Sequence, residues 1–435
     1  MRGRQHADVG ISGERIIAVG DVGKADREID ASGLLLLPGC IDLHTHLAST
    51  PTWTPLDGFA TGTRAAIAGG VTTVVSMVYQ EEGSLRRGVE RALRDAALSI
   101  ADYAFHIVVV DPSDAAIAEL PGLVRDGHAG LKVFMVMKQF GERLTDFLRL
   151  YAAAKRSGML VAVHAEDAGI IADATAALYA KGKTSVRSFP ESRPVEAEVI
   201  AVRQAVQHAE LTGASLYLVH LSSQRAVAEL AAAKRRGLPI YGETRPLYLY
   251  LTRAYFERED AALWVGQPPL REHGDVDAIW AALADRSLDC VATDHIPRRR
   301  AEKLAPGLAF DKIPPGVSNL ETLLPMLYSE GVRKNRITVE RLVDVLATTP
   351  ARIAGLRRKG EIAVGKDADL VLFDAERTRT ITAAEMHSSA DYDPYEGWEV
   401  TGWPRAVILR GAVAYDGEIR ATPGTGRFVR REPLL

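Results

Sequence analysis

The chain has 435 residues, of which 47% are hydrophobic and 25% are charged, and its formal net charge is −3. This is the composition of a globular protein with room for one large core and a smaller one. The small negative charge gives no reason to expect nucleic acid or an anionic membrane surface as a partner. Two cysteines, Cys40 and Cys290, are too few for a secreted disulfide framework, so we expect a reduced, cytoplasmic location.

Hydropathy excludes several further classes of protein. No apolar run approaches the roughly 20 residues that a membrane-spanning helix needs. The first six residues lack the apolar segment of a signal peptide. No internal repeat of fixed period is present, which excludes solenoids and propellers.

Residues 1–38 are predicted to form the first part of a small β domain. Residues 7–11 and 15–19 have the pattern of short strands, and a Ser12-Gly13-Glu14 turn separates them. A short apolar run at residues 34–37 follows, and Pro38-Gly39 ends it.

Residues 39–355 alternate between apolar, β-branched runs and helical stretches. The eight runs are residues 41–47, 72–78, 105–110, 130–137, 160–164, 215–221, 239–243 and 289–293. Continuous apolar strands that alternate with helices indicate a parallel sheet buried on both faces. Eight such units predict the α/β class and, within it, a (β/α)8 or TIM barrel.

Residues 356–435 return to short strands. The runs at residues 368–373 and 405–409 lie between Gly and Pro turns. We expect them to pair with the N-terminal strands in a small β-sandwich that is built from both chain ends, followed by a tail.

The first chemical signal is His44-Thr45-His46, at the end of the first barrel run. Residues two apart in a strand point to the same face, so both imidazoles can reach one ion. Polar residues also occur toward the ends of four other runs: Lys132, His164, His220 and Asp294. Because the carboxyl ends of barrel strands converge on one mouth, we expect these six side chains to share a pocket.

Each of these residues also has an ordinary structural interpretation. A single buried histidine is usually a hydrogen-bonded core residue, and Asp294 could cap a helix. Lys132 is different, because an ammonium in an apolar strand is costly unless it is paired. Six such residues on five strands favour a metal site. Imidazoles with a carboxylate suit zinc, manganese, cobalt or iron, and two such ions can hold a hydroxide that attacks a carbonyl.

The chain resembles the amidohydrolase superfamily, and within it the hydantoinases and dihydropyrimidinases. The resemblance covers nearly the whole chain and is carried by PGCIDLHTH at 38–46, AGGVTT at 68–73, VHAED at 163–167, PPLR at 268–271, TDH at 293–295, KGEI at 359–362 and GKDADL at 365–370. The stretch at 387–397 is most similar to hydantoinases and dihydropyrimidinases.

The resemblance implies a role for each site residue. His44, His46 and Asp294 would bind one divalent metal, His164 and His220 would bind the second, and Lys132, carboxylated on its ε-nitrogen, would bridge the two. Asp294 would also be the general acid and base. Zinc is the expected metal, a small cyclic amide or ureide is the expected substrate, and the expected assembly is a homotetramer or homodimer.

The sequence departs from this pattern in the expected substrate pocket. Met137 stands where many hydantoinases have a tyrosine that donates to the oxyanion, and methionine donates no hydrogen bond. Such a loss lowers rates about 10²–10³-fold unless another group replaces the donor. The resemblance places substrate contacts at Gln267 and Pro315, and Pro315 has no N–H to offer. It also implies one more strand before residue 7.

Three other functions remain open. Allantoinases act on a hydantoin with a ureido arm, and nothing in the sequence excludes that substrate. Dihydroorotases usually carry an arginine where this chain has Ala48, which makes that activity the weaker alternative. Some dihydropyrimidinase relatives are non-catalytic scaffolds that have lost metal ligands, whereas all six positions are intact here.

Other polar residues are given simpler roles. We expect His106 to be a core residue and His295 to support the ligands from outside. We expect His128, His208 and His273 to be solvated. Residues 298–300 are predicted to form a solvated arginine loop that could border the pocket. Glu166 could orient His164 or cap a helix.

Overall fold

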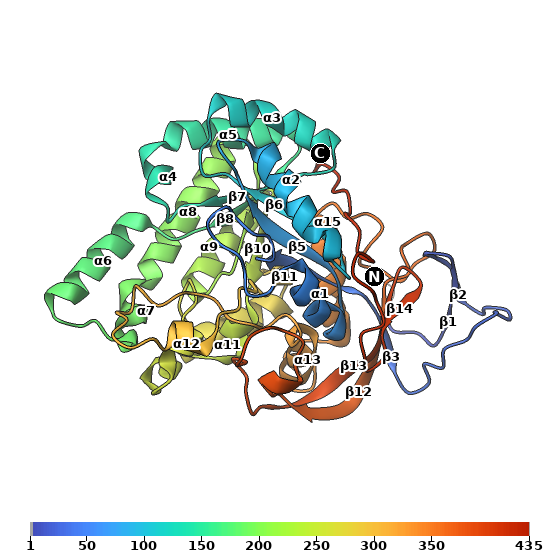
Figure 1. Ribbon diagram of the computed structural model, residues 1–435. Helices are drawn as coiled ribbons and strands as arrows, with labels where there is room; N and C mark the ends of the chain where they lie inside the picture. The colour runs from blue at the N-terminus through green and yellow to red at the C-terminus, as the bar shows by residue number, and fades with distance from the viewer. Residues whose placement is uncertain (1–2, 435) are drawn as a thin grey trace.

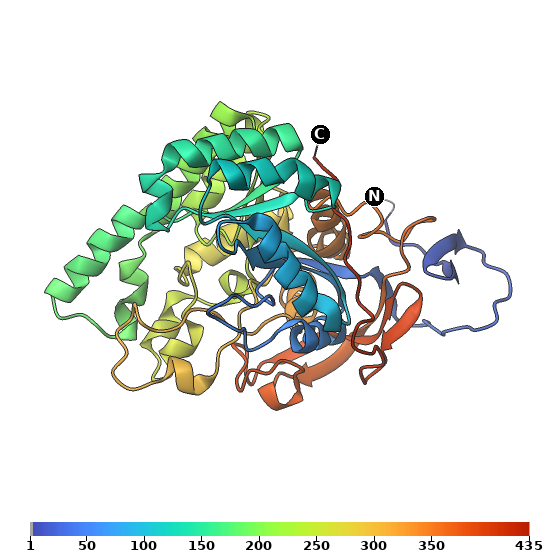
Figure 2. The ribbon, with the colours of Figure 1, turned by 45° about the horizontal axis from the view of Figure 1, so that its top comes forward.

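The structure, a computed structural model, describes residues 3–434. A barrel lies at its centre, and helices surround the barrel on most sides (Figures 1 and 2). A smaller β region, in which the dark blue and orange segments from the two chain ends come together, lies beside the barrel (Figure 1). Residues 3–434 contain no helix that is both long and apolar enough to cross a membrane.

Eight parallel strands form the barrel in the order β11-β10-β9-β8-β7-β6-β5-β4, so that neighbours in the sheet are also neighbours along the chain. Their bounds are β4 Cys40–Thr45, β5 Val71–Tyr79, β6 Asp102–Val108, β7 Gly130–Phe134, β8 Leu160–His164, β9 Ser215–Leu218, β10 Ile240–Thr244 and β11 Cys290–Val291. A bridge between Thr45 and His295 joins the first strand to the segment after the last. The predicted (β/α)8 barrel is confirmed.

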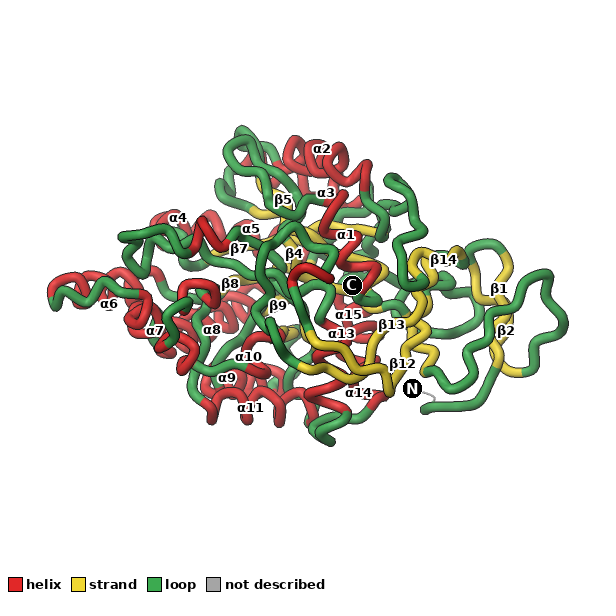
Figure 3. The backbone as a smooth tube through the Cα atoms, turned by 60° about the horizontal axis from the view of Figure 1, so that its bottom comes forward, coloured by secondary structure: helices red, strands yellow, loops and turns green. Residues whose placement is uncertain are grey.

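Helices follow each barrel strand and lie outside the sheet (Figure 3). The longer ones are α1 Phe59–Ala68, α2 Leu85–Asp95, α3 Asp114–Arg125, α5 Leu144–Ser157, α6 Ala168–Ala180, α8 Val195–Thr212, α9 Gln224–Arg235 and α11 His273–Ala284. Shorter ones are α4 Lys138–Glu142, α7 Phe189–Ser192, α10 Pro246–Tyr250, α12 Arg300–Lys303, α13 Leu323–Leu327, α14 Val339–Val343 and α15 Thr349–Ile353. Single turns are η1 Ala96–Leu98, η2 Val186–Ser188, η3 Arg253–Glu257, η4 Ala261–Trp264, η5 Tyr328–Val332, η6 Asp344–Thr348 and η7 Ala383–Glu385.

Helix α2 shows why such segments are helical and where they begin. The Ser84 side chain caps its first turn by accepting a hydrogen bond from the Arg87 backbone N–H. Leu85, Val89 and Ala92 recur at helical spacing and are buried, and the charged residues between them are exposed or partly exposed. The helix therefore packs an apolar face against the sheet and leaves a charged face in solvent.

The second β region pairs the two chain ends as predicted. A four-stranded antiparallel sheet has the order β14-β13-β12-β3, with β3 Leu35–Pro38, β12 Leu370–Thr380, β13 Glu399–Leu409 and β14 Ala412–Tyr415. Strands β1 Asp8–Ser12 and β2 Arg15–Gly20 form a separate hairpin, which joins the C-terminal part through Ile16 N–H to Lys366 O at 3.0 Å. Ile16, Leu370 and Ile408 pack in one apolar cluster with their neighbours. The boundaries at residues 38/39 and 355/356 remain predictions.

The last residues pass the amino ends of three barrel strands. Val429 N–H donates to Tyr103 O at 2.8 Å near the start of β6, and Leu434 N–H donates to Gly158 O at 2.8 Å just before β8. The Arg431 guanidinium enters the barrel and donates to Phe105 O at 2.7 Å. A Cβ at Gly130 would lie 1.9 Å from Arg431 Nη1, so any side chain at this strand start would displace the guanidinium. The tail therefore closes the amino end of the barrel.

Candidate active site

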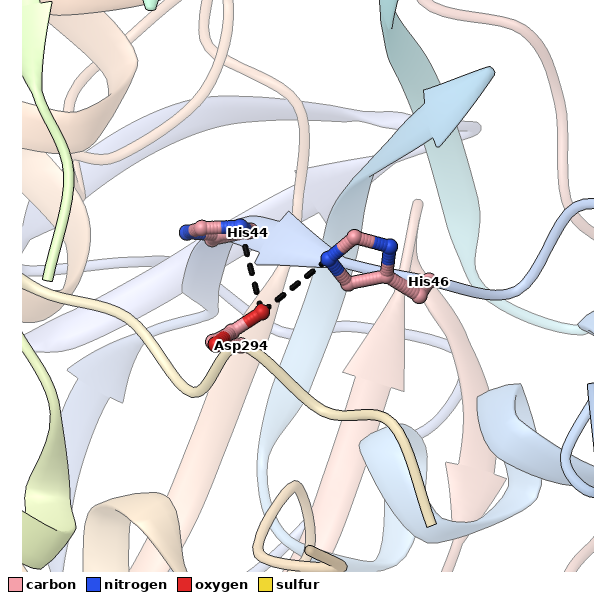
Figure 4. A group of neighbouring side chains, drawn as sticks. All are labelled: His44, His46 and Asp294. Carbon is pink, nitrogen blue, oxygen red and sulfur yellow. Dashed lines mark hydrogen bonds and ion pairs between the residues drawn. The ribbon is translucent and has the colours of Figure 1, made fainter. Parts of the chain in front are cut away.

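His44, His46 and Asp294 form one compact cluster at the carboxyl end of the barrel (Figure 4). Asp294 Oδ1 lies 3.2 Å from His44 Nε2 and 3.0 Å from His46 Nε2. All three residues are buried, and one ligand atom from each lies within 4.8 Å of the others. Three inward-facing donor atoms at this spacing can hold one metal ion, which is the arrangement that the His-x-His spacing predicts.

The structure brings His164, His220 and Lys132 to the same end of the barrel. The ring centroids of His164 and His220 are 4.6 Å apart, and those of His220 and His44 are 5.5 Å apart. Lys132 is fully buried, and its Nζ has no hydrogen-bond partner among residues 3–434. Burial lowers the pKa of Lys132 to about 7, although Glu243 and Asp294 oppose that shift. All six predicted ligands therefore lie at the same end of the barrel, and three of them form the compact cluster.

Two of the barrel strands that are shorter than their apolar runs end a few residues before a candidate ligand. The runs at 215–221 and 289–293 form only β9 Ser215–Leu218 and β11 Cys290–Val291. His220 has φ 45° and Asp294 has φ 51°, both in the left-handed region that non-glycine residues rarely adopt. Backbone of this kind leaves the strand and turns the side chain into the mouth of the barrel.

Two buried carboxylates hold the histidines in place. Glu243 Oε1 lies 2.9 Å from His44 Nδ1 and also accepts from the His220 backbone N–H at 3.0 Å. Glu166 Oε2 lies 2.7 Å from His164 Nε2, so the orienting role predicted as one option for Glu166 is the one observed. Such contacts fix which ring nitrogen faces a metal and raise its basicity. Glu243 was not among the predicted site residues, although it ends the run at 239–243 as the candidate ligands end theirs.

Burial favours the neutral imidazoles of His46, His164 and His220, and nearby positive charge favours the ionised carboxylate of Asp294. Burial lowers the pKa of His46, of His164 and, most strongly, of His220. Burial raises the pKa of Asp294, but the charges of His44 and Arg245 outweigh burial and hold that pKa well below its usual range. Neutral imidazole and ionised carboxylate are the forms that bind a divalent metal.

The expected substrate positions lie on two segments that contact each other. Gly316 N–H, next to Pro315, donates to Val265 O at 3.0 Å, two residues before Gln267. Met137 lies elsewhere, at the N-cap of α4, and its side chain is half-buried. The segments that carry Gln267 and Pro315 therefore form one surface, called here the wall. The substrate-contact role of Met137 stays a separate prediction.

The other histidines divide between the two ends of the barrel. His295 is buried, with Nε2 3.1 Å from Asp57 Oδ2, and therefore braces a loop and contacts no predicted ligand side chain. His106 is a core residue as predicted, and its Nδ1 lies 3.3 Å from Arg431 Nη1. The predicted solvation of His128 is wrong, because Phe428 of the tail covers its ring at a centroid distance of 4.6 Å. His208 is half-buried against Phe140, and of the three histidines predicted to be solvated only His273 is exposed.

Comparison with known proteins agrees with this fold and identifies the family. The amidohydrolase family profile matches residues 35–414. A D-hydantoinase of Ralstonia pickettii is 38% identical over 441 residues, which cover 99% of this chain and 96% of that protein. A crystal structure of dihydropyrimidinase from Brevibacillus agri has a TM-score of 0.94 at 38% identity and covers 99% and 96% of the two chains. An L-hydantoinase (dihydropyrimidinase) from Arthrobacter aurescens has a TM-score of 0.90 at 27% identity, with 98% and 96% covered.

The chain belongs to the amidohydrolase family, a family of metal-dependent hydrolases. Within that family it belongs with the hydantoinases and dihydropyrimidinases. The predicted family and the predicted class of enzyme, a hydrolase of C–N bonds in cyclic amides, are both confirmed.

Proposed function

We propose that this protein opens a hydantoin or dihydropyrimidine ring by adding water across its amide C–N bond. The water oxygen bonds to the ring carbonyl carbon, the C–N bond breaks, and the freed nitrogen takes up a proton, so the product carries a carboxylate and a ureido group. One observation carries this proposal: four imidazoles, one carboxylate and an unpartnered buried lysine converge at the ends of β4, β7, β8, β9 and the segment after β11.

The residues fit a pair of metal ions. His44, His46 and Asp294 would hold one ion, and His164 with His220 would hold the other. A buried Lys132 amine without a partner is a group that can add CO2, lose a proton and become a carbamate anion between two cations. Bound ions, which we propose to be zinc, would supply an activated water and polarise the ring carbonyl.

Asp294 is the residue placed to move the proton. Its Oδ1 faces the two histidines, and its Oδ2 lies 3.2 Å from Arg245 Nη1. A carboxylate held in this way can take a proton from the attacking water and deliver it to the leaving nitrogen. We propose that the Met137 side chain shapes the substrate pocket and donates no hydrogen bond to the oxygen of the ring carbonyl.

The alternatives are weaker. Allantoinase shares the ring and the mechanism, but the relatives and solved structures reported above are hydantoinases and dihydropyrimidinases. For dihydroorotase, Ala48 is buried and offers no charge to a carboxylate. For a non-catalytic scaffold, the six predicted ligands would have no reason to converge.

We also propose a cytoplasmic homo-oligomer, either a tetramer or a dimer. Cys40 and Cys290 are both free thiols, which fits a reducing compartment. Helix α6 has the sequence AGIIADATAALYA, and Leu178 is its only buried residue. An apolar helix that projects from the barrel on the left of Figure 1 supports burial against a second copy.

The experiment is a ring-opening assay on protein purified with zinc and bicarbonate. Loss of ultraviolet absorbance would follow dihydrouracil, 5-substituted hydantoins of both hands, allantoin and dihydroorotate. His44→Ala is the test variant, and His273→Ala, which changes an exposed histidine, is the matched control. We expect the parent and the control to open at least one ring and to bind metal, and His44→Ala to lose both properties. A parent that binds no metal and opens no ring would overturn the proposal.

A further inference from the structure

Three cationic side chains gather around the wall that carries Gln267 and Pro315. Arg245 directly follows β10 and is fully buried, Lys303 ends α12 and is fully buried, and Arg298 lies just before α12 and is half-buried. Burial lowers the pKa of Lys303 well below its usual range, and the nearby charges of Arg245 and Arg298 lower it further, so the two guanidinium groups are the permanent charges here. The three residues are named here the cationic cluster, and Arg245 and Arg298 make it a source of positive potential.

Arg298 is the accessible member of the cluster. Its Nε donates to Pro315 O at 3.3 Å, and its guanidinium carbon lies 5.2 Å from the centroid of the Trp53 ring in the loop after β4. These contacts hold the guanidinium between two loops at the carboxyl end of the barrel. Its two terminal amino groups have no hydrogen-bond partner among the described residues, so they are free to bind a ligand.

Lys303 holds the two segments of the wall together. Its Nζ donates to Leu263 O at 3.0 Å, Val265 O at 2.8 Å and Gly316 O at 2.6 Å. All three acceptors are backbone carbonyl groups on the two segments of the wall. Lys303 thus fixes the position of the segment that contacts Arg298.

Arg245 meets the one acid in contact with the cluster within residues 3–434. Its Nη1 lies 3.2 Å from Asp294 Oδ2, whereas its Nε and Nη2 have no partner. Glu302 acts on Arg298 only from an exposed position. Arg245 therefore has one carboxylate partner, which the proposed function assigns to a metal, and Arg298 has no buried carboxylate partner among the described residues.

We propose that the cationic cluster selects cyclic amides whose ring substituent ends in a carboxylate, and that Arg298 binds this carboxylate at the mouth of the pocket. This inference rests on the proposed function and specifies its substrate class. A guanidinium with two free amino groups matches a carboxylate in two parallel hydrogen bonds. The buried charge of Arg245 acts through a poorly polarisable interior, which strengthens its attraction for an anion.

The first test compares two rings that differ in charge and hardly in shape: 5-carboxymethylhydantoin and its primary amide. We expect the parent to have a kcat/KM for the carboxylate ring about tenfold or more above that for the amide ring. Arg298→Gln lowers kcat/KM for the carboxylate ring about 10–100-fold, mostly through KM, and brings the ratio of the two rings toward one. Arg298→Lys keeps part of the preference, and the exposed neighbour variant Arg300→Gln keeps all of it.

The second test measures binding without turnover. Calorimetry compares N-carbamoylaspartate with N-carbamoylasparagine, the products of the two rings, on the parent and on Arg298→Gln. A parent preference for the aspartate product that Arg298→Gln abolishes supports the inference. Equal affinity of the parent for both products overturns it, whether or not the rings are opened. Failure of every ring to open overturns the proposed function instead, and the binding preference still decides the inference.

Discussion

The two ends of the barrel are built in different ways. At the carboxyl end, the candidate ligands sit at or just beyond strand ends, and each is local to its own apolar run. At the amino end, the barrel contacts residues 427–434, which are distant in the sequence, and Arg431 donates hydrogen bonds to backbone carbonyl groups. Barrel enzymes use the first end for chemistry and the second for stability. Substitutions at the carboxyl end should therefore lower activity most, and substitutions at the amino end should lower stability most.

The largest expected effect is at the carboxyl end. Asp294→Asn removes the group that moves the proton and a metal ligand with it. We expect kcat/KM for ring opening to fall about 10²–10⁴-fold or more. An active Asp294→Asn enzyme would contradict the role given to this residue.

At the amino end, Arg431→Met should lower stability and leave activity nearly unchanged. The guanidinium donates to Ala354 O at 2.9 Å and Phe105 O at 2.7 Å, and both carbonyls would lose a buried partner. We expect the free energy of unfolding to fall by about 2–3 kcal/mol. We expect kcat to stay within about twofold, and the exposed Arg430→Met variant to change neither quantity. A large loss of kcat in Arg431→Met would show that the two ends are coupled.

The same difference between the two ends explains which features could be predicted from the sequence and which could not. Apolar runs and the residues that end them are local signals, so the barrel and the six candidate ligands could be predicted from His44-Thr45-His46 onward. The tail could not, because its contacts with Tyr103 and Gly158 span more than 270 residues and leave no periodic pattern. His128 was misassigned for this reason, since the Phe428 ring that covers it lies 300 positions away.

Glu243 is the carboxylate that contacts His44, and its substitution is expected to have a smaller effect, on zinc affinity. It accepts from the Tyr217 hydroxyl and contacts His44 Nδ1, and the Tyr217 ring stacks on His106, which in turn meets Arg431. Glu243→Gln should weaken zinc binding about 10–100-fold, as loss of an orienting carboxylate does in other metal sites. Competition with a chelator would measure it. Unchanged zinc affinity would show that His44 needs no such partner.

The smallest expected effect is a pH dependence at the amino end. Burial lowers the pKa of His128 to about 4, although Asp126 opposes the shift, so the folded protein takes up this proton less readily than the unfolded chain does. The stability is then complete above about pH 6.5 and falls as the pH drops toward 4. The loss from pH 8 to pH 6 should be about 1 kcal/mol.

His128→Phe would remove this loss. Phenylalanine keeps the stacking against Phe105 and Phe428, and Nδ1 of His128 has no hydrogen-bond partner to lose. Urea unfolding at pH 8 and pH 6 should therefore show a smaller decrease for His128→Phe than for the parent, whereas the exposed His273→Gln should match the parent. An identical decrease in all three proteins would mean that the tail leaves His128 open to water. The closure of the amino end would then be looser than the contacts of Phe428 and Arg431 indicate.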